Sequence, residues 1–176
     1  MDKNNLLKSV SLFYDLSEKE LGYISSRMIA KKFETGNLIF MENSEGEKCF
    51  FVAEGSVKVT RLSKDGKEVI LAMLNKGEFF GEMALLDGES RSANVIALEH
   101  TKVLTLNRED FLSVLQDYPQ IAIQLLKEIA HRLRKSDRQI ASLSLSDAEK
   151  RIALCILRFA DEQGIIKNGE VNIPTV

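Results

Sequence analysis

The sequence predicts a mainly β protein of the α+β class, in which a small antiparallel β-roll over residues 28–106 is followed by a long helix. Two observations carry this prediction. Glycines recur every 9 to 11 residues between positions 36 and 88, and segments rich in β-branched and aromatic residues lie between them. This spacing is typical of short strands joined by turns. After position 118, apolar residues recur at alternating separations of four and three, which indicates a helix with one apolar side.

The first element is expected to be a helix over residues 18–27. Ser17 and Glu20 have the spacing of a capping box, in which each side chain accepts a hydrogen bond from the other residue's backbone N–H. Leu16 and Leu21 flank this cap and are placed to close a hydrophobic staple.

The strands of the roll follow, and an enclosed apolar roll offers a pocket for a small molecule. Asp65-Gly66 is a hairpin signal, because this dipeptide adopts the positive φ angles of tight two-residue turns. The last two strands are expected over residues 93–97 and 102–106. Earlier strands are expected around residues 38–40, 50–52, 57–59 and 69–71.

Two helices are expected after the roll. Asn107 is a suitable N-cap for the first, and Pro119 marks the start of the second, over residues 118–145. Because a helix must bury an apolar seam, we expect a homodimer through residues 118–145, as a parallel coiled coil. The alternative is that the seam packs on the chain's own roll. The seam consists of Ala122, Leu126, Ile129, Leu133, Ser136, Ile140 and Leu143.

Composition narrows the class of protein. The 176 residues carry a formal charge of -2 and a pI near 5.8, which gives no electrostatic reason for this segment to grip nucleic acid. Cys49 and Cys155 are far apart and follow no signal-like N-terminus, so we expect two reduced thiols in a cytoplasmic protein. No apolar run approaches the roughly 18 residues of a membrane-spanning helix, so we expect a soluble chain without a membrane partner.

The run GEFFGEMALLDGESRSA, residues 77–93, contains the groups needed to hold a cyclic phosphodiester. Gly81 lies where a strand turns into a short helix, so backbone N–H groups can approach an anionic oxygen there. Arg91 can direct two N–H donors to phosphate oxygens, and Ser92 adds a hydroxyl donor. Glu82 supplies an acceptor suited to a ribose 2′-hydroxyl. The run therefore predicts a nucleotide sensor.

Two alternatives stay open at this point. The run can be an ordinary loop in which Glu82 and Arg91 form an ion pair, and such a pair can also be remade around a nucleotide. On the long helix, Ser136 is the polar member of the seam and can simply fix its register. If the helix passes beside the roll, Ser136 and its neighbour Asp137 become candidates for contacting the base.

The C-terminal residues begin another unit. Ser146 to Glu149 form a second capping box for a new helix, and residues 169–176 start an extended segment. Residues 146–176 bury little by themselves, so we interpret them as the opening of a second domain that is incomplete in this chain.

Along its whole length the chain resembles the Crp/Fnr family, the cyclic-AMP receptor protein and fumarate-nitrate regulator group of bacterial transcription factors. The most specific block is FGEMALLDGESRSA, residues 80–93, which resembles the family's phosphate-binding cassette; SLSDAEKRIALCIL, residues 144–157, adds weaker support. The resemblance implies a jelly-roll sensor domain over residues 1–117, a dimerisation helix over 118–145 and an incomplete winged-helix domain over 146–176. It implies DNA and RNA polymerase as partners of the full-length protein.

The resemblance also assigns site residues. Gly81, Glu82, Met83, Ala84, Arg91 and Ser92 are implied to hold phosphate and ribose. Ser136 and Asp137 lie where cyclic-AMP-binding members contact adenine with two hydroxyl residues, so Asp137 departs from that pattern.

The leading hypothesis is a sensor, not an enzyme, that binds cyclic AMP, or cyclic GMP, and couples it to dimer geometry. The alternative is a dimeric regulator of the same fold that answers to another effector or to none. No catalytic residue, metal ligand or prosthetic group is expected. His100 and His131 are interpreted as ordinary surface or packed residues, which leaves an enzyme without a plausible metal or catalytic constellation.

Overall fold

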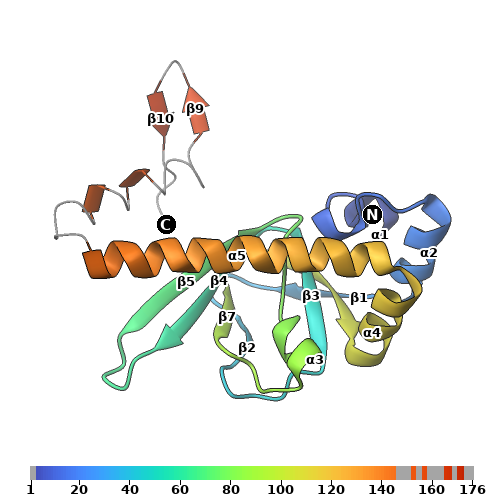
Figure 1. Ribbon diagram of the computed structural model, residues 1–176, viewed down its shortest axis with the longest axis horizontal. Helices are drawn as coiled ribbons and strands as arrows, with labels where there is room; N and C mark the ends of the chain where they lie inside the picture. The colour runs from blue at the N-terminus through green and yellow to red at the C-terminus, as the bar shows by residue number, and fades with distance from the viewer. Residues whose placement is uncertain (1–2, 146–151, 154–155, 158–164, 168–169, 173–176) are drawn as a thin grey trace. The chain divides into compact units, whose positions relative to one another are not determined.

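The computed structural model describes residues 3–145, 152–153, 156–157, 165–167 and 170–172. The chain divides into two compact units, Met1–Leu125 and Leu126–Val176. The first unit contains the predicted β-roll and the helices around it (Figure 1).

Two four-stranded antiparallel sheets form the roll, as the glycine spacing predicted. The strand order is β1-β8-β3-β6 in the first sheet and β2-β7-β4-β5 in the second. The first sheet is built from β1 Ile29–Phe33, β3 Lys48–Glu54, β6 Phe79–Phe80 and β8 Thr101–Asn107. The second is built from β2 Leu38–Phe40, β4 Ser56–Leu62, β5 Glu68–Asn75 and β7 Asn94–Ala97.

The core lies between the two sheets, because alternate residues of each strand point to opposite faces. Phe50 on β3 and Phe80 on β6 stack inside the roll, with their ring centroids 5.1 Å apart. Their neighbours Phe51 and Phe79 point to the other face of the same sheet. There the ring centroids of Phe51 and Phe13 are 5.2 Å apart. Both faces of β3 are therefore covered, and its five central residues are buried.

The helices of the first unit confirm the predicted caps. Ser17 and Glu20 form the capping box of α2, and Asn107 caps α4 by accepting from the backbone N–H of Asp110. The N-terminal pieces α1 and η1 were not predicted. The elements outside the sheets are α1 Lys3–Leu7, η1 Ser11–Phe13, α2 Glu18–Arg27, α3 Met83–Asp87, α4 Arg108–Asp117 and α5 Pro119–Leu145.

Replacing Ser17 by alanine should lower the free energy of unfolding by about 1 kcal/mol, because the N-terminus of α2 loses its side-chain acceptor. Urea denaturation measures this change. Ser26→Ala is the matched control, since the Ser26 hydroxyl on the same helix only donates to the carbonyl of Tyr23. Equal losses in the two variants would show that the cap contributes nothing specific.

The long helix α5 begins at Pro119, as predicted. Its first turns bury Ile121 and Leu125 in the first unit. Three apolar residues of the predicted seam are exposed instead: Leu126, Leu133 and Ile140 are 65%, 61% and 61% exposed in the single chain. Among the described residues, α5 therefore carries exposed apolar side chains on the predicted seam.

The last described residues form an antiparallel pair of strands, β9 Ile165–Lys167 and β10 Glu170–Asn172. β10 lies within the extended segment expected from residue 169. The capping box at Ser146–Glu149 and Cys155 lie outside the described residues. Over the described residues, no helix combines the length and the hydropathy that crossing a membrane requires.

Candidate phosphate-binding site

The cassette, defined here as residues 80–93, folds as the sequence predicted, from a strand into a short helix. Gly81 follows β6 and has φ of 78°, a left-handed conformation that residues with a side chain rarely adopt. The helix α3 begins two residues later and ends at Gly88, which is also left-handed, with φ of 77°. The two glycines thus reverse the chain at both ends of α3.

The side chain of Arg91 points into the protein and is only 4% exposed. Its Nη1 donates to the carbonyl oxygen of Gly81 at 2.7 Å, and its Nη2 donates to the carbonyl oxygen of Lys48 at 2.6 Å. The guanidinium therefore joins the end of β6 to the start of β3, beneath the cassette.

The rest of the guanidinium is enclosed by aromatic rings. Its Cζ lies 4.3 Å from the ring centroid of Phe40 and 5.7 Å from that of Phe50, distances at which the ring faces attract a cation. The Nε atom of Arg91 is buried and has no hydrogen-bond partner among the described residues. A buried N–H without an acceptor is unfavourable, so this atom marks the place where an acceptor fits.

A buried cation and a buried carboxylate lie close together at this place. Burial lowers the pKa of the Arg91 guanidinium, and the Glu82 carboxylate opposes this shift. Glu82 is itself 3% exposed, and it lies close enough to Arg91 for the two charges to interact. Beneath them, burial raises the pKa of the Cys49 thiol far above its ordinary range, so Cys49 is an unreactive packed residue.

The structure brings together Gly81, Glu82 and Arg91, three of the predicted site residues. Ala84 is buried beside them, whereas Met83 and Ser92 are exposed. Ser136 and Asp137 belong to α5 in the second unit, where both are exposed and the Ser136 hydroxyl donates to the carbonyl of Arg132. Their predicted contact with a base stays a prediction.

Sequence reasoning missed the groups that hold Arg91 in place. The Lys48 carbonyl and the Phe40 ring lie 43 and 51 positions away in the sequence, and a carbonyl has no signature in sequence. Gly46 was seen only as a member of the glycine series. In the structure, a Cβ at position 46 would lie 2.2 Å from Cβ of Ala84, so this glycine allows the turn before β3 to touch the cassette.

The two histidines, which the sequence analysis interpreted as surface or packed residues, both lie at the surface. Nδ1 of His100 is 3.1 Å from Oε2 of Glu34, and both side chains are exposed. His131 is exposed on α5.

Known proteins are similar to this chain in sequence and in fold. The model of the family described as the cyclic nucleotide-binding domain matches residues 30–118. The cyclic AMP receptor protein of Thermus thermophilus is 36% identical over 152 residues, which cover 86% of this chain and 70% of that protein. The chain belongs to the Crp/Fnr family.

Other relatives of this Crp/Fnr-family chain share its sensor fold. The crystal structure of the T. thermophilus catabolite activator protein is 37% identical, with a TM-score of 0.70. That match covers 76% of this chain and 63% of the other. Human cGMP-dependent protein kinase 2 is 34% identical over 155 residues, covering 86% of this chain and 20% of the kinase. The jelly-roll fold implied by the resemblance is thereby confirmed.

Proposed function

We propose that the chain is the sensor part of a transcription regulator and that a cyclic mononucleotide binds at the cassette. The observation that carries this proposal is the buried guanidinium of Arg91, whose Nε has no partner within the described part of the chain. A guanidinium presents five N–H donors, and the carbonyls of Gly81 and Lys48 use only two of them. A phosphate diester supplies an acceptor for Nε and an anionic partner for the guanidinium.

The other cassette residues have complementary parts in this proposal. Backbone N–H groups of Met83 and Ala84 contact the phosphate, and the Ser92 hydroxyl donates to it. The Glu82 carboxylate accepts from the ribose 2′-hydroxyl, which distinguishes a ribonucleotide from a deoxyribonucleotide. The cassette thus recognises the part that all cyclic ribonucleotides share.

The base is read elsewhere, and we propose Ser136 and Asp137 as its readers. A carboxylate only accepts hydrogen bonds, so Asp137 suits the amino group of adenine and also the two adjacent donors of guanine. We propose cyclic AMP as the effector, because a cyclic AMP receptor protein is among the most similar relatives. The kinase named for cyclic GMP and the Asp137 carboxylate make cyclic GMP the competing effector.

Coupling to DNA follows from the long helix in this proposal. The exposed Leu126, Leu133 and Ile140 pair with the same residues of a second copy, which gives a homodimer through α5. Cyclic-nucleotide binding shifts the orientation of the paired helices and enables a DNA-binding domain to dock and recruit RNA polymerase. The role is that of a cytoplasmic sensor rather than an enzyme.

A thermal-shift panel tests the proposed effector. At a concentration near 100 times its dissociation constant, a bound ligand adds about 2.7 kcal/mol of stability. We expect cyclic AMP to raise the melting temperature most, cyclic GMP less and linear AMP not at all. A larger shift with cyclic GMP would make cyclic GMP, rather than cyclic AMP, the effector. No shift with either cyclic nucleotide would favour a different effector or none.

A further inference from the structure

The second half of α5 carries a row of basic side chains on one face. Lys127, His131, Arg134 and Arg138 follow one another at separations of four, three and four residues. With 3.6 residues per turn, such positions lie on the same side of an α-helix, one above the other. All four side chains are exposed. These four residues, called the basic row here, span about 16 Å along the helix axis at 1.5 Å per residue.

The basic row forms no ion pair with a carboxylate among the described residues. The acidic residues of this part of the helix are Glu128 and Asp137, and each is adjacent in sequence to a member of the row. Adjacent residues of a helix do not face each other. Oε1 of Glu128 instead lies 3.5 Å from Nε of Arg132, which is outside the row. The cations of the row are therefore open to an anionic partner.

The proposed dimer leaves this row accessible. With Leu126 and Leu133 at position a of the heptad, the members of the basic row take positions b and f. In a parallel coiled coil, positions a and d face the partner helix, whereas b and f point away from it. Pairing through α5 thus covers the apolar seam and keeps the basic row at the surface.

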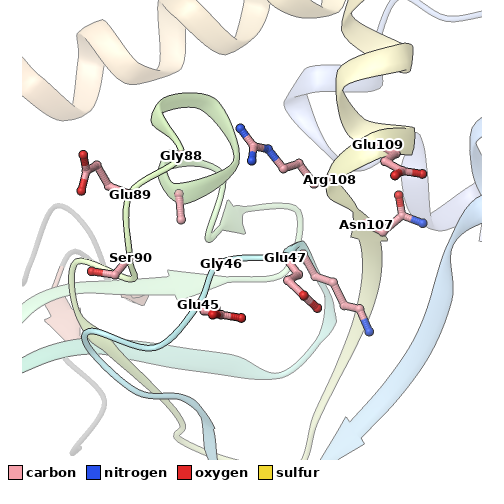
Figure 2. A pocket seen from close by; sticks show the side chains of 11 residues that line it. Glu45, Gly46, Glu47, Gly88, Glu89, Ser90, Asn107, Arg108 and Glu109 are labelled. Atoms are coloured by element: carbon pink, nitrogen blue, oxygen red, sulfur yellow. The ribbon is translucent and has the colours of Figure 1, made fainter.

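Carboxylates gather elsewhere, on the first unit. The pocket in Figure 2, between the turn before β3 and the start of α4, is lined by four glutamates and two cations. These charged residues are Glu45, Glu47, Glu89, Glu109, Lys48 and Arg108. Residues 126–142 instead contain five lysines and arginines and two acidic residues. The net charge of -2 averages over both surfaces, so it does not exclude a polyanion at α5.

We propose that the basic row binds the phosphate backbone of duplex DNA. This inference goes beyond the proposed function, because it needs neither a nucleotide at the cassette nor a separate DNA-binding domain. Each DNA strand carries one phosphate per roughly 3.4 Å of its axis, so a strand lying along the row offers about five anions. These anions repeat in a line, as the cations of the row do.

The side chains of the row suit phosphate oxygens. The guanidinium groups of Arg134 and Arg138 each direct two parallel N–H donors at a phosphate, and the Lys127 ammonium binds as a point charge. Contacts of this kind read no base, so binding has no sequence preference. The competing occupant is an acidic protein surface. Isolated exposed ion pairs contribute little, whereas neutralised DNA phosphates release condensed counterions, which favours DNA.

Fluorescence anisotropy with a short labelled DNA duplex of arbitrary sequence tests the inference. We expect the 176-residue chain to bind the duplex in about 50 mM salt and to lose affinity as salt is raised to about 200 mM. A plot of log association constant against log salt concentration falls by about 0.9 for each phosphate neutralised. Lys127, Arg134 and Arg138 therefore predict a slope of about -2.7.

Two substitutions in the row test its role. Arg134→Gln and Arg138→Gln each remove one cation, and glutamine keeps a high helix propensity. Each should make the slope shallower by about 0.9, and the double variant by about 1.8. Arg108→Gln is the matched control, since it removes the same charge beside the carboxylates of the Figure 2 pocket. Its slope should equal that of the wild type, and urea denaturation establishes that each variant is folded.

The outcomes also separate this proposal from the cyclic-nucleotide sensor. Absence of DNA binding, or an unchanged slope in the double variant, overturns the role of the basic row. Binding of polyglutamate as tight as that of DNA also overturns it, in favour of an acidic protein partner. A chain that binds the duplex but no cyclic nucleotide keeps the basic row and loses the sensor.

Discussion

Replacing Arg91 by alanine is expected to abolish cyclic-nucleotide binding. The variant leaves the phosphate without the buried cation that balances its charge, and truncating one partner of a buried charged pair costs about 2–5 kcal/mol. This corresponds to a loss of affinity of roughly 30-fold to several thousandfold. Isothermal titration calorimetry with cyclic AMP and cyclic GMP measures the loss. Affinity equal to that of the wild type would contradict the account.

Two further variants make this result specific. Arg91→Lys keeps the positive charge but loses the planar fork, so it should bind more weakly than the wild type and better than the alanine variant. Arg61→Ala removes an exposed arginine of β4 that pairs with Glu42, and this variant should bind the nucleotide as the wild type does. Urea denaturation of the Arg91 variants establishes that each one is folded before its affinity is compared.

Replacing Gly81 by alanine is expected to lower the free energy of unfolding by several kcal/mol, roughly the sum of a backbone and a packing penalty, and to weaken nucleotide binding. Its φ of 78° costs an alanine about 1–2 kcal/mol. The new Cβ would lie 2.7 Å from Nη1 of Arg91 and 3.3 Å from a ring carbon of Phe50. Overpacking of this kind adds about 1–3 kcal/mol and pushes the guanidinium out of its place.

Gly66→Ala separates the two contributions. Gly66 has nearly the same backbone angle, with φ of 76°, but nothing lies within 4 Å of its added Cβ. Urea denaturation should therefore show the backbone penalty alone at position 66 and a clearly larger loss at position 81. Calorimetry should show normal nucleotide affinity for Gly66→Ala and weakened affinity for Gly81→Ala. Equal losses in stability would mean that the contact with Arg91 is not tight.

Local signals explain why most of the fold was predictable. Three of these signals act between residues at most four positions apart, so the sequence alone predicts their structural effect. They are the capping box at Ser17, the Asn107 cap and the Asp65-Gly66 turn. The pieces α1 and η1 have only five and three residues. Their formation depends on burial of side chains such as Phe13 against the roll, which no local pattern encodes.

The candidate site likewise contains residues that the sequence predicts and residues that only the structure reveals. Gly81, Glu82 and Arg91 lie within one cassette, so their order along the chain revealed them together. The Lys48 carbonyl, the Phe40 ring and the narrow space at Gly46 reach Arg91 only through tertiary folding. The sequence therefore singled out Arg91 as the candidate phosphate-binding group, whereas the structure was needed to find the groups that hold its side chain in place.

The Nε–H resonance of Arg91 tests the central claim most directly. In the structure this donor is buried without a partner among the described residues. Titration of the ¹⁵N-arginine-labelled chain with a cyclic nucleotide should move the Nε–H proton signal downfield as it gains a phosphate acceptor, in parallel with binding. A nucleotide that binds and leaves this signal unmoved, or cyclic nucleotides that do not bind at all, would contradict the assignment of Arg91 as the phosphate receptor.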